Sequence, residues 1–587
     1  MTEKFDLDKI TKQVEDAALR HYGSTFKFRP NQKEAVVNTI FNWLTGNSKD
    51  VILQGPTGSG KSAIGLLVAA VLSEDYDKKG YIVISDLSLI QQYERDCDKF
   101  FHSYAVIKGQ QTYTCFKNGL NFATGHCKLK GCKTFADIYK KFPDCVGECQ
   151  YLIDREAAMK ARVTVCTYSF WLIQQNLVKP KVDNPPFDTR DFVICDEAHK
   201  LVSIVQNHFS PSFGEGDIGR FKNVVESASP DDMNVVDEIE RIRERIKFCE
   251  DNQQIFDLLK EYLDKMKIIT DAAETIKREL SDKLENKEAL EKEDRILVFN
   301  SDFIDDHFGT FTEYVNIIEK SGVQNLVKNP SGEKILFNCI DESYLMGKYF
   351  HSNCGFKLYM SATIGEPGAY ARDIATDNFY SIDIPSTFDF TNSPIFYVGE
   401  YKLSYKEKQY SLPKIVDMIV ATINMYAGKR GIIQTGSYEF AKALMESVPQ
   451  NIKRRLILYD GSKEKDEAIA YFKSCDDKIL VGPSLIEGLS FDDDLCRFQI
   501  IMKVPYPSLA DKFVKAKQEI KPEWYSNTTA IAILQGVGRG VRSEHDWCVT
   551  FIFDGCFTYL MQKAYAMFPK KFINRIKPIA PSTLGCN

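Results

Sequence analysis

The nine residues from Gln54 to Ser62, QGPTGSGKS, restrict the possible folds of this chain more than any other stretch. They follow the apolar run 51–53, which predicts a buried parallel strand, and they precede 62–72, which predicts a helix. A glycine-rich loop in this setting turns backbone N–H groups toward phosphates, beside the positive end of the helix. We expect Lys61 to reach the β- and γ-phosphates and the Ser62 hydroxyl to hold Mg²⁺.

The loop residues expected to surround the phosphates are Gly55, Thr57, Gly58, Ser59 and Gly60. The alternative is a loop that only turns the chain, but that role does not require the complete spacing in this context. The sequence therefore predicts a nucleoside triphosphate site.

The length and composition predict a globular protein of several domains. The 587 residues suffice for about three or four domains, and 44% hydrophobic with 27% charged residues is ordinary for such proteins. No apolar run approaches about 18 residues, so we expect no membrane span. The charged start MTEKFDLDKI lacks a signal-peptide core, which predicts an intracellular protein.

That compartment is reducing, so the sixteen cysteines are not expected to form a disulfide framework. The net charge of −6 means that a nucleic-acid partner would have to bind a locally basic surface.

A polar cluster, Asp196-Glu197-Ala198-His199, follows the apolar run 192–195, which predicts another buried strand. Polar groups at the carboxyl end of a parallel strand face the ligand crevice. We expect Asp196 to hold Mg²⁺ through water and Glu197 to orient and deprotonate the attacking water. His199 is a candidate for coupling hydrolysis to a second α/β half. Upstream, the Gln32 amide offers a donor and an acceptor to the adenine edge, although a surface glutamine near a helix start is an equal alternative.

Residues 215–350 have a different sequence pattern, because their apolar residues recur at spacings of three and four. This periodicity predicts amphipathic helices with charged outer faces, and hence an inserted helical domain. A self-associating coiled coil is the alternative, but breaks such as Asp251-Asn252 favour antiparallel packing within one chain. The residues that carry the pattern are Val235, Ile239, Ile242, Ile246, Cys249, Leu259, Tyr262, Met266, Ile269, Ile276, Leu280 and Leu284.

A second α/β half follows, without a phosphate-binding loop of its own. Apolar runs predict strands at 431–437, 478–482, 498–502 and 549–553. Near the end of this half, QGVGRGVR places Arg539 and Arg542 three residues apart, on nearly one face of a helix. Guanidinium groups suit the charge on a transferring phosphoryl group. We therefore predict one nucleotide between two α/β lobes, which close on it with the arginines as fingers.

With its motifs in this order, the chain from Gln32 to about Asp554 resembles the superfamily 2 helicases. The ordered set is GPTGSGKS, DEAH, SATI at 361–364, SLIEG at 484–488 and QGVGRGVR at 535–542. The resemblance implies an α/β fold with two RecA-like lobes, ATP and Mg²⁺ as cofactors, and roles in the nucleotide site for Glu487, Gly488 and Gln535. The stretches 85–88 and 490–493 depart from the motifs of the family.

A narrower resemblance is to the iron–sulfur helicases of the XPD/DinG group. KGQQTYTC, which ends at Cys115, is similar to the segment that ends in the first cluster cysteine of that group. Cys149-Gln150-Tyr151, followed by Ala157 and Ala158, is similar to the segment with the last one. The insertion between DEAH and SATI matches the arch domain in placement. The resemblance implies an ATP-hydrolysing helicase that translocates 5′-to-3′ on single-stranded DNA and unwinds duplex DNA at junctions. We expect it to be a monomer, cytoplasmic or located wherever the DNA is.

Five cysteines lie between the first two ATPase motifs: Cys115, Cys127, Cys132, Cys145 and Cys149. Short paired spacings suit either zinc or a [4Fe–4S] cluster. The spacing alone favours zinc, whereas the family resemblance favours the cluster, with four of the five as ligands. The resemblance indicates Cys115 and Cys149 first and then Cys145. Cys127 and Cys132 compete for the last place, and His126 is a less favoured ligand.

The cysteine segment also carries lysines interleaved with aromatic residues. Ammonium groups would follow phosphates, and rings would stack on bases or open a duplex junction. We therefore hypothesise that the segment forms part of a DNA pore; the alternative is a solvated face with its own small core. The residues concerned are Lys128, Lys130, Lys133, Lys140, Lys141, Phe135, Tyr139 and Phe142.

The motifs divide the chain into two lobes and two insertions. Lobe 1 is expected in 1–108, 156–214 and 351–392, the last with a linker, and lobe 2 in 393–587. A cysteine-rich iron–sulfur domain is expected at 109–155 and a helical arch at 215–350. Two other functions stay open: a DEAH-type RNA helicase of opposite direction with a zinc-binding insertion, and an ATP-dependent nucleic-acid clamp that does not translocate.

Overall fold

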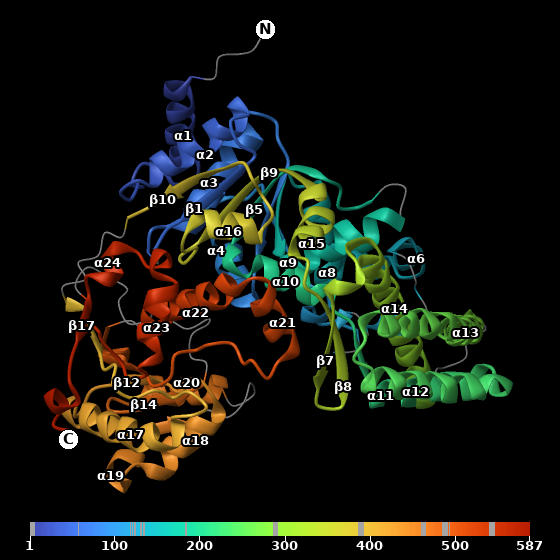
Figure 1. Cartoon of the computed structure of the whole chain (residues 1–587). Helices are drawn as coiled ribbons and strands as arrows, with labels where there is room; N and C mark the ends of the chain where they lie inside the picture. The colour runs from blue at the N-terminus through green and yellow to red at the C-terminus, as the bar shows by residue number, and fades with distance from the viewer. Residues whose placement is uncertain are drawn as a thin grey trace.

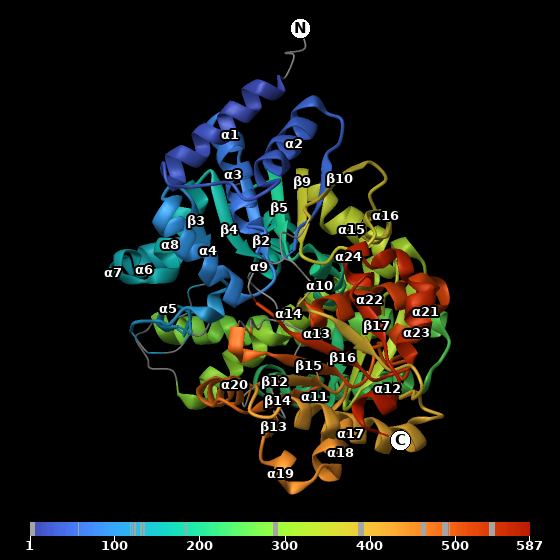
Figure 2. The ribbon, with the colours of Figure 1, turned by 90° about the vertical axis from the view of Figure 1, so that its left-hand side faces the viewer.

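Two parallel β-sheets, one in each half of the chain, form the cores of two lobes in the computed structural model (Figure 1). Lobe 1 lies above lobe 2 in the side view (Figure 2). The structure describes residues 6–56, 58–117, 119, 121–122, 125–129, 132, 135–181, 185–285, 291–385, 392–458, 465–483, 491, 493–538 and 546–586.

The lobe 1 sheet has the strand order β10-β1-β9-β5-β2-β4-β3, with parallel pairing throughout. Both of its faces are covered, because Val51 and Leu53 belong to one buried core while Ile52 belongs to another. The strands are β1 (Asp50–Gln54), β2 (Gly80–Ile84), β3 (Ala105–Ile107), β4 (Val163–Thr167), β5 (Arg190–Asp196), β9 (Cys354–Ser361) and β10 (Phe379–Asp383). The loops after β1, β5 and β9 open at one edge of this sheet.

Several helices of lobe 1 matter for the site. They are α1 (Leu7–Tyr22), α2 (Gln32–Thr45), α3 (Lys61–Glu74), α4 (Leu87–Phe100), α10 (Leu201–His208) and α16 (Pro367–Asp373). The strands predicted around the phosphate-binding loop and before Asp196 are confirmed as β1 and β5.

The lobe 2 sheet has the order β13-β14-β12-β15-β16-β11-β17 and is also parallel. Its strands are β11 (Ile395–Tyr397), β12 (Gly431–Gln434), β13 (Leu456–Leu458), β14 (Ile479–Gly482), β15 (Phe498–Ile501), β16 (Val549–Ile552) and β17 (Ile576–Pro578). The helices include α17 (Lys408–Met425), α18 (Tyr438–Ser447), α20 (Lys465–Ser474), α21 (Lys512–Ile520), α22 (Pro522–Val537), α23 (Cys556–Lys563) and α24 (Lys570–Ile573). The four strands predicted in this half are confirmed as β12, β14, β15 and β16.

An inserted unit between β5 and β9 contains the predicted amphipathic helices. They are α11 (Glu215–Ala228), α12 (Met233–Phe248), α13 (Asn252–Glu285) and α14 (Lys292–Ser321). Residues of the predicted apolar pattern, such as Ile239, Tyr262 and Met266, are buried between them; Cys249 is only half-buried, and Leu284 lies outside the described side chains. The helices therefore pack against one another within one chain.

The same unit contains a small antiparallel sheet that the helical periodicity did not predict. It has the order β6-β8-β7, formed by β6 (Ser212–Gly214), β7 (Leu326–Ser331) and β8 (Lys334–Cys339). The turn between β7 and β8 is only Gly332 and Glu333, and the positive φ of 60° at Gly332 suits a tight hairpin. α15 (Glu342–Tyr349) then leads back to β9.

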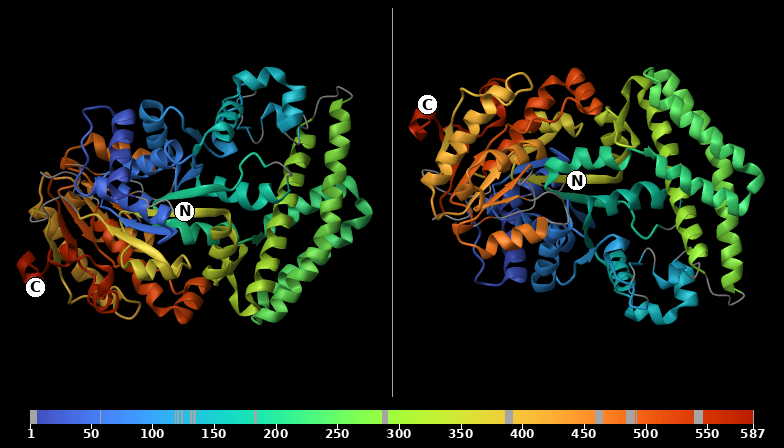
Figure 3. Two further views of the ribbon diagram at one scale, coloured as in Figure 1. Left: turned by 90° about the horizontal axis from the view of Figure 1, so that it is seen from above. Right: turned by 90° about the horizontal axis from the view of Figure 1, so that it is seen from below.

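Short helices fill the connection between β3 and β4, where the five cysteines lie. They are α5 (His126–Leu129), α6 (Phe135–Lys141), α7 (Pro143–Glu148) and α8 (Gln150–Lys160). Seen from above and below, this segment and the long helices α11–α14 extend to the same side of the two lobes (Figure 3). Throughout the part of the chain that the structure describes, every helix is too short or too polar to cross a membrane.

Candidate active site

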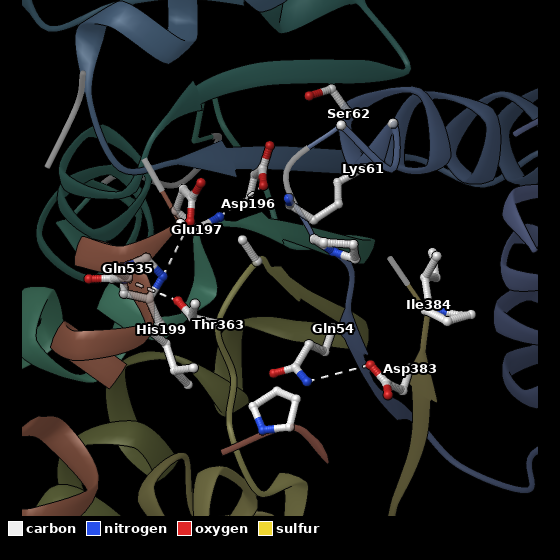
Figure 4. A pocket seen from close by; sticks show the side chains of 18 of the residues that line it. Gln54, Lys61, Ser62, Asp196, Glu197, His199, Thr363, Asp383, Ile384 and Gln535 are labelled. Atoms are coloured by element: carbon white, nitrogen blue, oxygen red, sulfur yellow. Dashed lines mark hydrogen bonds and ion pairs between the residues drawn. The ribbon is translucent and has the colours of Figure 1, made fainter. Parts of the chain in front are cut away.

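A cavity of about 930 Å³ lies between the two lobes and contains most of the predicted nucleotide site (Figure 4). Lobe 1 contributes the phosphate-binding loop and the strand ends after β5, β9 and β10. Lobe 2 contributes the end of α22 and the region of α24. The lining residues that could contact phosphates or the attacking water are Gly58, Gly60, Lys61, Ser62, Asp196, Glu197, His199, Thr363, Gln535, Lys570 and Lys571.

The phosphate-binding loop has the backbone that its glycines predict. Gly58 and Gly60 have φ values of 85° and 79°, which residues with a β-carbon rarely adopt. A β-carbon at Gly55 would lie 2.7 Å from the Ser59 hydroxyl. The ammonium group of Lys61 donates to the Gly55 carbonyl at 2.9 Å, so it lies inside the loop. Thr57 lies outside the described residues.

Asp196 and Glu197 stand side by side at the end of β5, yet their pKa values are shifted in opposite directions. Burial raises the pKa of Asp196 to about 6, and the neighbouring Glu197 charge adds to the rise while Lys61 opposes it. Burial would also raise the pKa of Glu197, but the hydrogen bond from His199, with the charges of Lys61 and Lys200, outweighs it and brings that pKa to about 2. Both groups are therefore ionised at neutral pH.

The backbone conformation at Glu197 explains why the adjacent carboxylates of Asp196 and Glu197 point in different directions. Its φ of 50° and ψ of 46° lie in the left-handed region, which is strained for a non-glycine residue. The turn makes the Glu197 carboxylate face His199, with 3.2 Å between Glu197 Oε2 and His199 Nδ1, while Asp196 stays in line with the strand. Asp196 is 2% exposed.

His199 connects the two lobes. Its Nε2 lies 2.8 Å from Nε2 of Gln535 on α22, and the same Gln535 nitrogen donates to the Thr363 hydroxyl at 3.1 Å. Its Nδ1 lies 2.8 Å from the hydroxyl of Ser361. The residues that the sequence placed in DEAH, SATI and the last lobe 2 motif therefore meet in one hydrogen-bonded group (Figure 4).

Gln32 does not face the cavity in this structure. It is 2% exposed, its Oε1 accepts from the Arg29 backbone N–H at 3.0 Å, and its Nε2 donates to the Gly60 carbonyl at 3.2 Å. The amide thus supports the phosphate-binding loop, and its predicted contact with adenine stays a prediction. Arg29, which the sequence analysis did not select, lines the cavity.

Some predicted site residues fall outside the described residues: Thr57, Glu487, Gly488, Arg539 and Arg542. Their roles stay predictions. Lobe 2 nevertheless brings basic side chains to the cavity, because Lys570, Lys571 and Arg575 line it. Sequence reasoning missed these three because they follow the last recognisable motif and belong to no local pattern.

Tyr93 is the other functional candidate that the sequence analysis missed. It lies on α4, is fully buried, and donates its hydroxyl proton to Asp196 Oδ2 at 2.9 Å. Ile90, Tyr93 and Cys97 form the buried face of this helix, so in the sequence Tyr93 has the signature of a core residue. Only the contact with Asp196, 103 residues away, distinguishes it.

The five candidate ligand cysteines are all buried. Burial raises the pKa of Cys145, and Cys149 and Cys115 are close enough to add to the rise. The backbone N–H of His126 lies 3.4 Å from Cys115 Sγ. Among the described residues, no three His, Cys, Asp or Glu side chains are arranged to hold a metal ion. The donor type and burial fit an iron–sulfur cluster or zinc, but the arrangement does not distinguish them.

The aromatic residues of the cysteine segment are partly in its own core. Phe135 and Phe142 pack against the buried cluster of this region, and the Arg155 guanidinium lies 3.7 Å from the centre of the Phe135 ring. These two rings therefore belong to a small core within the cysteine segment, as the alternative to a DNA pore predicts. Lys140 and Lys141 are exposed. The side chains of Lys128, Lys130 and Lys133 lie outside the described part, so the pore hypothesis stays a prediction.

Comparisons with known families agree with this architecture. Residues 25–230 match the family model described as the res subunit of type III restriction enzymes, and residues 420–574 match the model of a helicase C-terminal domain. The first match lies in the half with the phosphate-binding loop and DEAH, and the second lies in lobe 2.

Short segments of the chain resemble curated helicases. The chain is 26% identical over 133 residues to the ATP-dependent DNA helicase CHL1 of Debaryomyces hansenii, which is 19% of this chain and 16% of that protein. It is 29% identical over 93 residues to CHL1 of Meyerozyma guilliermondii, 13% of this chain and 11% of that one. The matches therefore span less than a fifth of these relatives.

Solved structures match over nearly the whole chain. An XPD helicase superposes with a TM-score of 0.63 at 17% identity, covering 95% of this chain and 100% of the other. Xpd4 of S. tokodaii superposes with a TM-score of 0.59 at 14% identity, covering 94% and 100%. At these identities the likeness is one of fold, and it confirms the predicted two-lobe α/β architecture.

Proposed function

We propose that this chain is an ATP-dependent DNA helicase of superfamily 2, of the XPD and CHL1 type. It would move 5′-to-3′ along single-stranded DNA and separate duplexes. The observation that carries the proposal is the hydrogen-bonded group of Glu197, His199 and Gln535, which joins a hydrolytic carboxylate on lobe 1 to a helix of lobe 2. A motor needs such a link, because hydrolysis in the cavity must change the position of one lobe relative to the other.

In the proposed hydrolysis, each side chain has one task. The phosphate-binding loop and Lys61 hold the β- and γ-phosphates, and Lys61 must leave the Gly55 carbonyl to do so. Glu197 orients the attacking water and accepts its proton, since its low pKa keeps it ionised before the reaction. Lys570, Lys571 and the predicted fingers Arg539 and Arg542 would supply positive charge from lobe 2.

Ser62 and Asp196 are the residues that would hold Mg²⁺, which supplies positive charge to the phosphates when bound. Four of the five buried cysteines would hold a [4Fe–4S] cluster, which cross-links the segment between β3 and β4 when bound. In this proposal residues 109–155 are the cluster domain and 215–350 are the arch beside it.

Coupling follows from the position of His199. Its Nδ1 faces the Glu197 carboxylate and its Nε2 faces Gln535, so any movement of α22 relative to lobe 1 alters the surroundings of Glu197. Single-stranded DNA that binds both lobes would thus influence the rate of hydrolysis. Hydrolysis would in turn change the position of lobe 2 relative to lobe 1.

Strand displacement by anaerobically purified protein with ATP and Mg²⁺ tests the proposal. We would compare duplexes that carry a 5′ DNA tail, a 3′ DNA tail or an RNA tail, with Lys61→Ala as the inactive control. Opening of only the 5′-tailed DNA is the expected result. Preference for a 3′ tail or for RNA would favour the RNA helicase alternative, and nucleic-acid-stimulated ATP hydrolysis without displacement would favour the clamp.

A further inference from the structure

The hydroxyl of Tyr93 is held against the predicted Mg²⁺ ligand by a rigid frame. The Asp86 side chain caps α4 by accepting from the Leu89 backbone N–H at 3.0 Å, which fixes where the helix begins. Tyr93 follows two turns later and is 0% exposed. Its ring therefore has one position, from which Oη donates to Asp196 Oδ2 at 2.9 Å.

Both oxygens of Asp196 have a donor in this arrangement. Oδ1 accepts from the Glu197 backbone N–H at 2.9 Å, and Oδ2 accepts from Tyr93. The backbone of Asp196 is itself fixed, because it pairs with Met360 of β9 in the centre of the lobe 1 sheet. The carboxylate thus has a single orientation before any metal or nucleotide arrives.

A buried carboxylate needs such donors for two reasons. Without them it would lose the hydrogen bonds that water gave it in the unfolded chain, at a cost in stability. A carboxylate that binds a metal also needs its partners in the surrounding shell, because they orient it, and their removal typically weakens metal binding 10- to 100-fold.

We propose that Tyr93 is a positioning residue that orients Asp196 for Mg²⁺-nucleotide, which rests on the proposed function because it presupposes an ATP site. Tyr93 itself does not reach the cavity: the lining residues of α4 and its N-terminus are Asp86, Ser88, Leu89, Gln92 and Asp96. Its effect is therefore transmitted through Asp196 and through Ser62, whose hydroxyl also hydrogen-bonds the Tyr93 hydroxyl.

Binding of a fluorescent non-hydrolysable ATP analogue, titrated with Mg²⁺, tests this role without relying on catalysis. Tyr93→Phe keeps the buried ring and removes only the hydroxyl. We expect the Mg²⁺ concentration for half-maximal tightening of nucleotide binding to rise about 10-fold. Binding of the analogue in EDTA should be the same for wild type and variant, because Tyr93 does not touch the nucleotide.

Tyr104→Phe is the matched control. Tyr104 belongs to the same buried core as Tyr93, and its hydroxyl donates to the Leu66 carbonyl at 3.3 Å, away from Asp196. It should keep the Mg²⁺ dependence of the wild type. An unchanged Mg²⁺ dependence in Tyr93→Phe, or equal shifts in both variants, would overturn the role of Tyr93. A wild-type chain that binds no nucleotide would instead overturn the proposed function, and the role of Tyr93 with it.

Discussion

Nε2 of His199 and Nε2 of Gln535 lie 2.8 Å apart across the boundary between the lobes. The amide nitrogen of Gln535 can only donate, so His199 Nε2 accepts and the imidazole proton lies on Nδ1, facing Glu197. This tautomer gives the Glu197 carboxylate a donor, which it shares with the Ser361 hydroxyl at 2.8 Å from the same nitrogen. The state of lobe 2 and the orientation of Glu197 are therefore linked through one imidazole ring.

Removal of the Gln535 amide should uncouple hydrolysis from the second lobe. In Gln535→Ala, His199 loses its lobe 2 partner and Glu197 is oriented less well, so we expect kcat of ATP hydrolysis to fall about 10-fold or more, with nucleotide affinity little changed. Steady-state ATPase assays with single-stranded DNA measure this. Glu523→Ala, an exposed position on the same helix, should behave as wild type; an equal loss there would mean that α22 had been disturbed generally.

A buried ion pair also joins lobe 2 to the return of the insertion into lobe 1. Glu342 at the start of α15 pairs with Lys517 of α21, and with Lys521 at 2.8 Å. The side chains of Lys517 and Glu342 are 3% and 1% exposed, and burial lowers the pKa of Lys517. A buried charge of this kind is tolerated only while its partner is present.

Glu342→Gln should therefore destabilise the protein strongly, by about 3 kcal/mol, because the buried Lys517 loses its hydrogen-bonded counter-charge and keeps the weaker attraction of Asp373. Urea unfolding at pH 7.5 measures the loss as a shift of the midpoint. Glu439→Gln breaks the exposed pair with Lys408 and should leave the midpoint unchanged. Similar small shifts in both variants would contradict a buried ionic contact between the lobes.

The insertion should be sensitive to acid because of His307. Burial, assisted by Arg220, lowers the pKa of this side chain to about 3, and its Nε2 contacts the Tyr262 hydroxyl at 2.6 Å. At this residue the folded state binds fewer protons than the unfolded state. The contribution of His307 to stability is therefore fully present above about pH 6.5 and is lost as the pH falls toward 3. At pH 5 the loss from this group is about 2 kcal/mol.

His307→Gln removes that titration and should flatten the dependence of the unfolding midpoint on pH between 7 and 5. His102→Gln, at an exposed position, should leave the dependence as in the wild type. Thermal unfolding followed by circular dichroism across this pH range provides the comparison, and parallel curves for wild type and His307→Gln would exclude His307 as the cause.

The parts that the sequence predicted share one property: their signal is local. The strand, loop and helix around Lys61 follow one another between Asp50 and Glu74, and the apolar spacing of α12 and α13 repeats within each helix. The hairpin β7–β8 was missed because its sequence alternates poorly: four consecutive residues of β7 are buried. Such a run gives no period of two to separate it from the surrounding helices.

Contacts between distant residues could not be predicted in the same way. A tyrosine on the apolar face of a helix, such as Tyr93, has the same pattern whether its hydroxyl meets a carboxylate or the backbone. The chemistry of Gln32 makes adenine and solvent equal alternatives as partners of its amide, whereas in the structure the amide is buried between the Arg29 N–H and the Gly60 carbonyl. In both cases only the packing of separate elements decides which partner the polar atom meets.

The cysteine segment gives the last prediction. Cys115 is buried, lies close to Cys145, as Cys149 does, and is the ligand that the resemblance indicates first. Protein purified without oxygen should contain about four irons and four sulfides per chain if the cluster forms, and Cys115→Ser should lose most of them. Unwinding should be abolished while some ATP hydrolysis remains, because the candidate ATP site lies elsewhere, in the cavity between the lobes.

Cys97→Ser is the matched control, because Cys97 is a buried cysteine of α4 that packs in the core of lobe 1. The Cys97→Ser protein should contain as much iron as the wild type and should unwind DNA normally. Metal analysis decides the nature of the site, since stoichiometric zinc in place of iron and sulfide would assign the cysteines to a zinc site and remove one reason for the 5′-to-3′ direction. A Cys115→Ser protein that retains its metal and unwinds normally would show that the other cysteines suffice without Cys115.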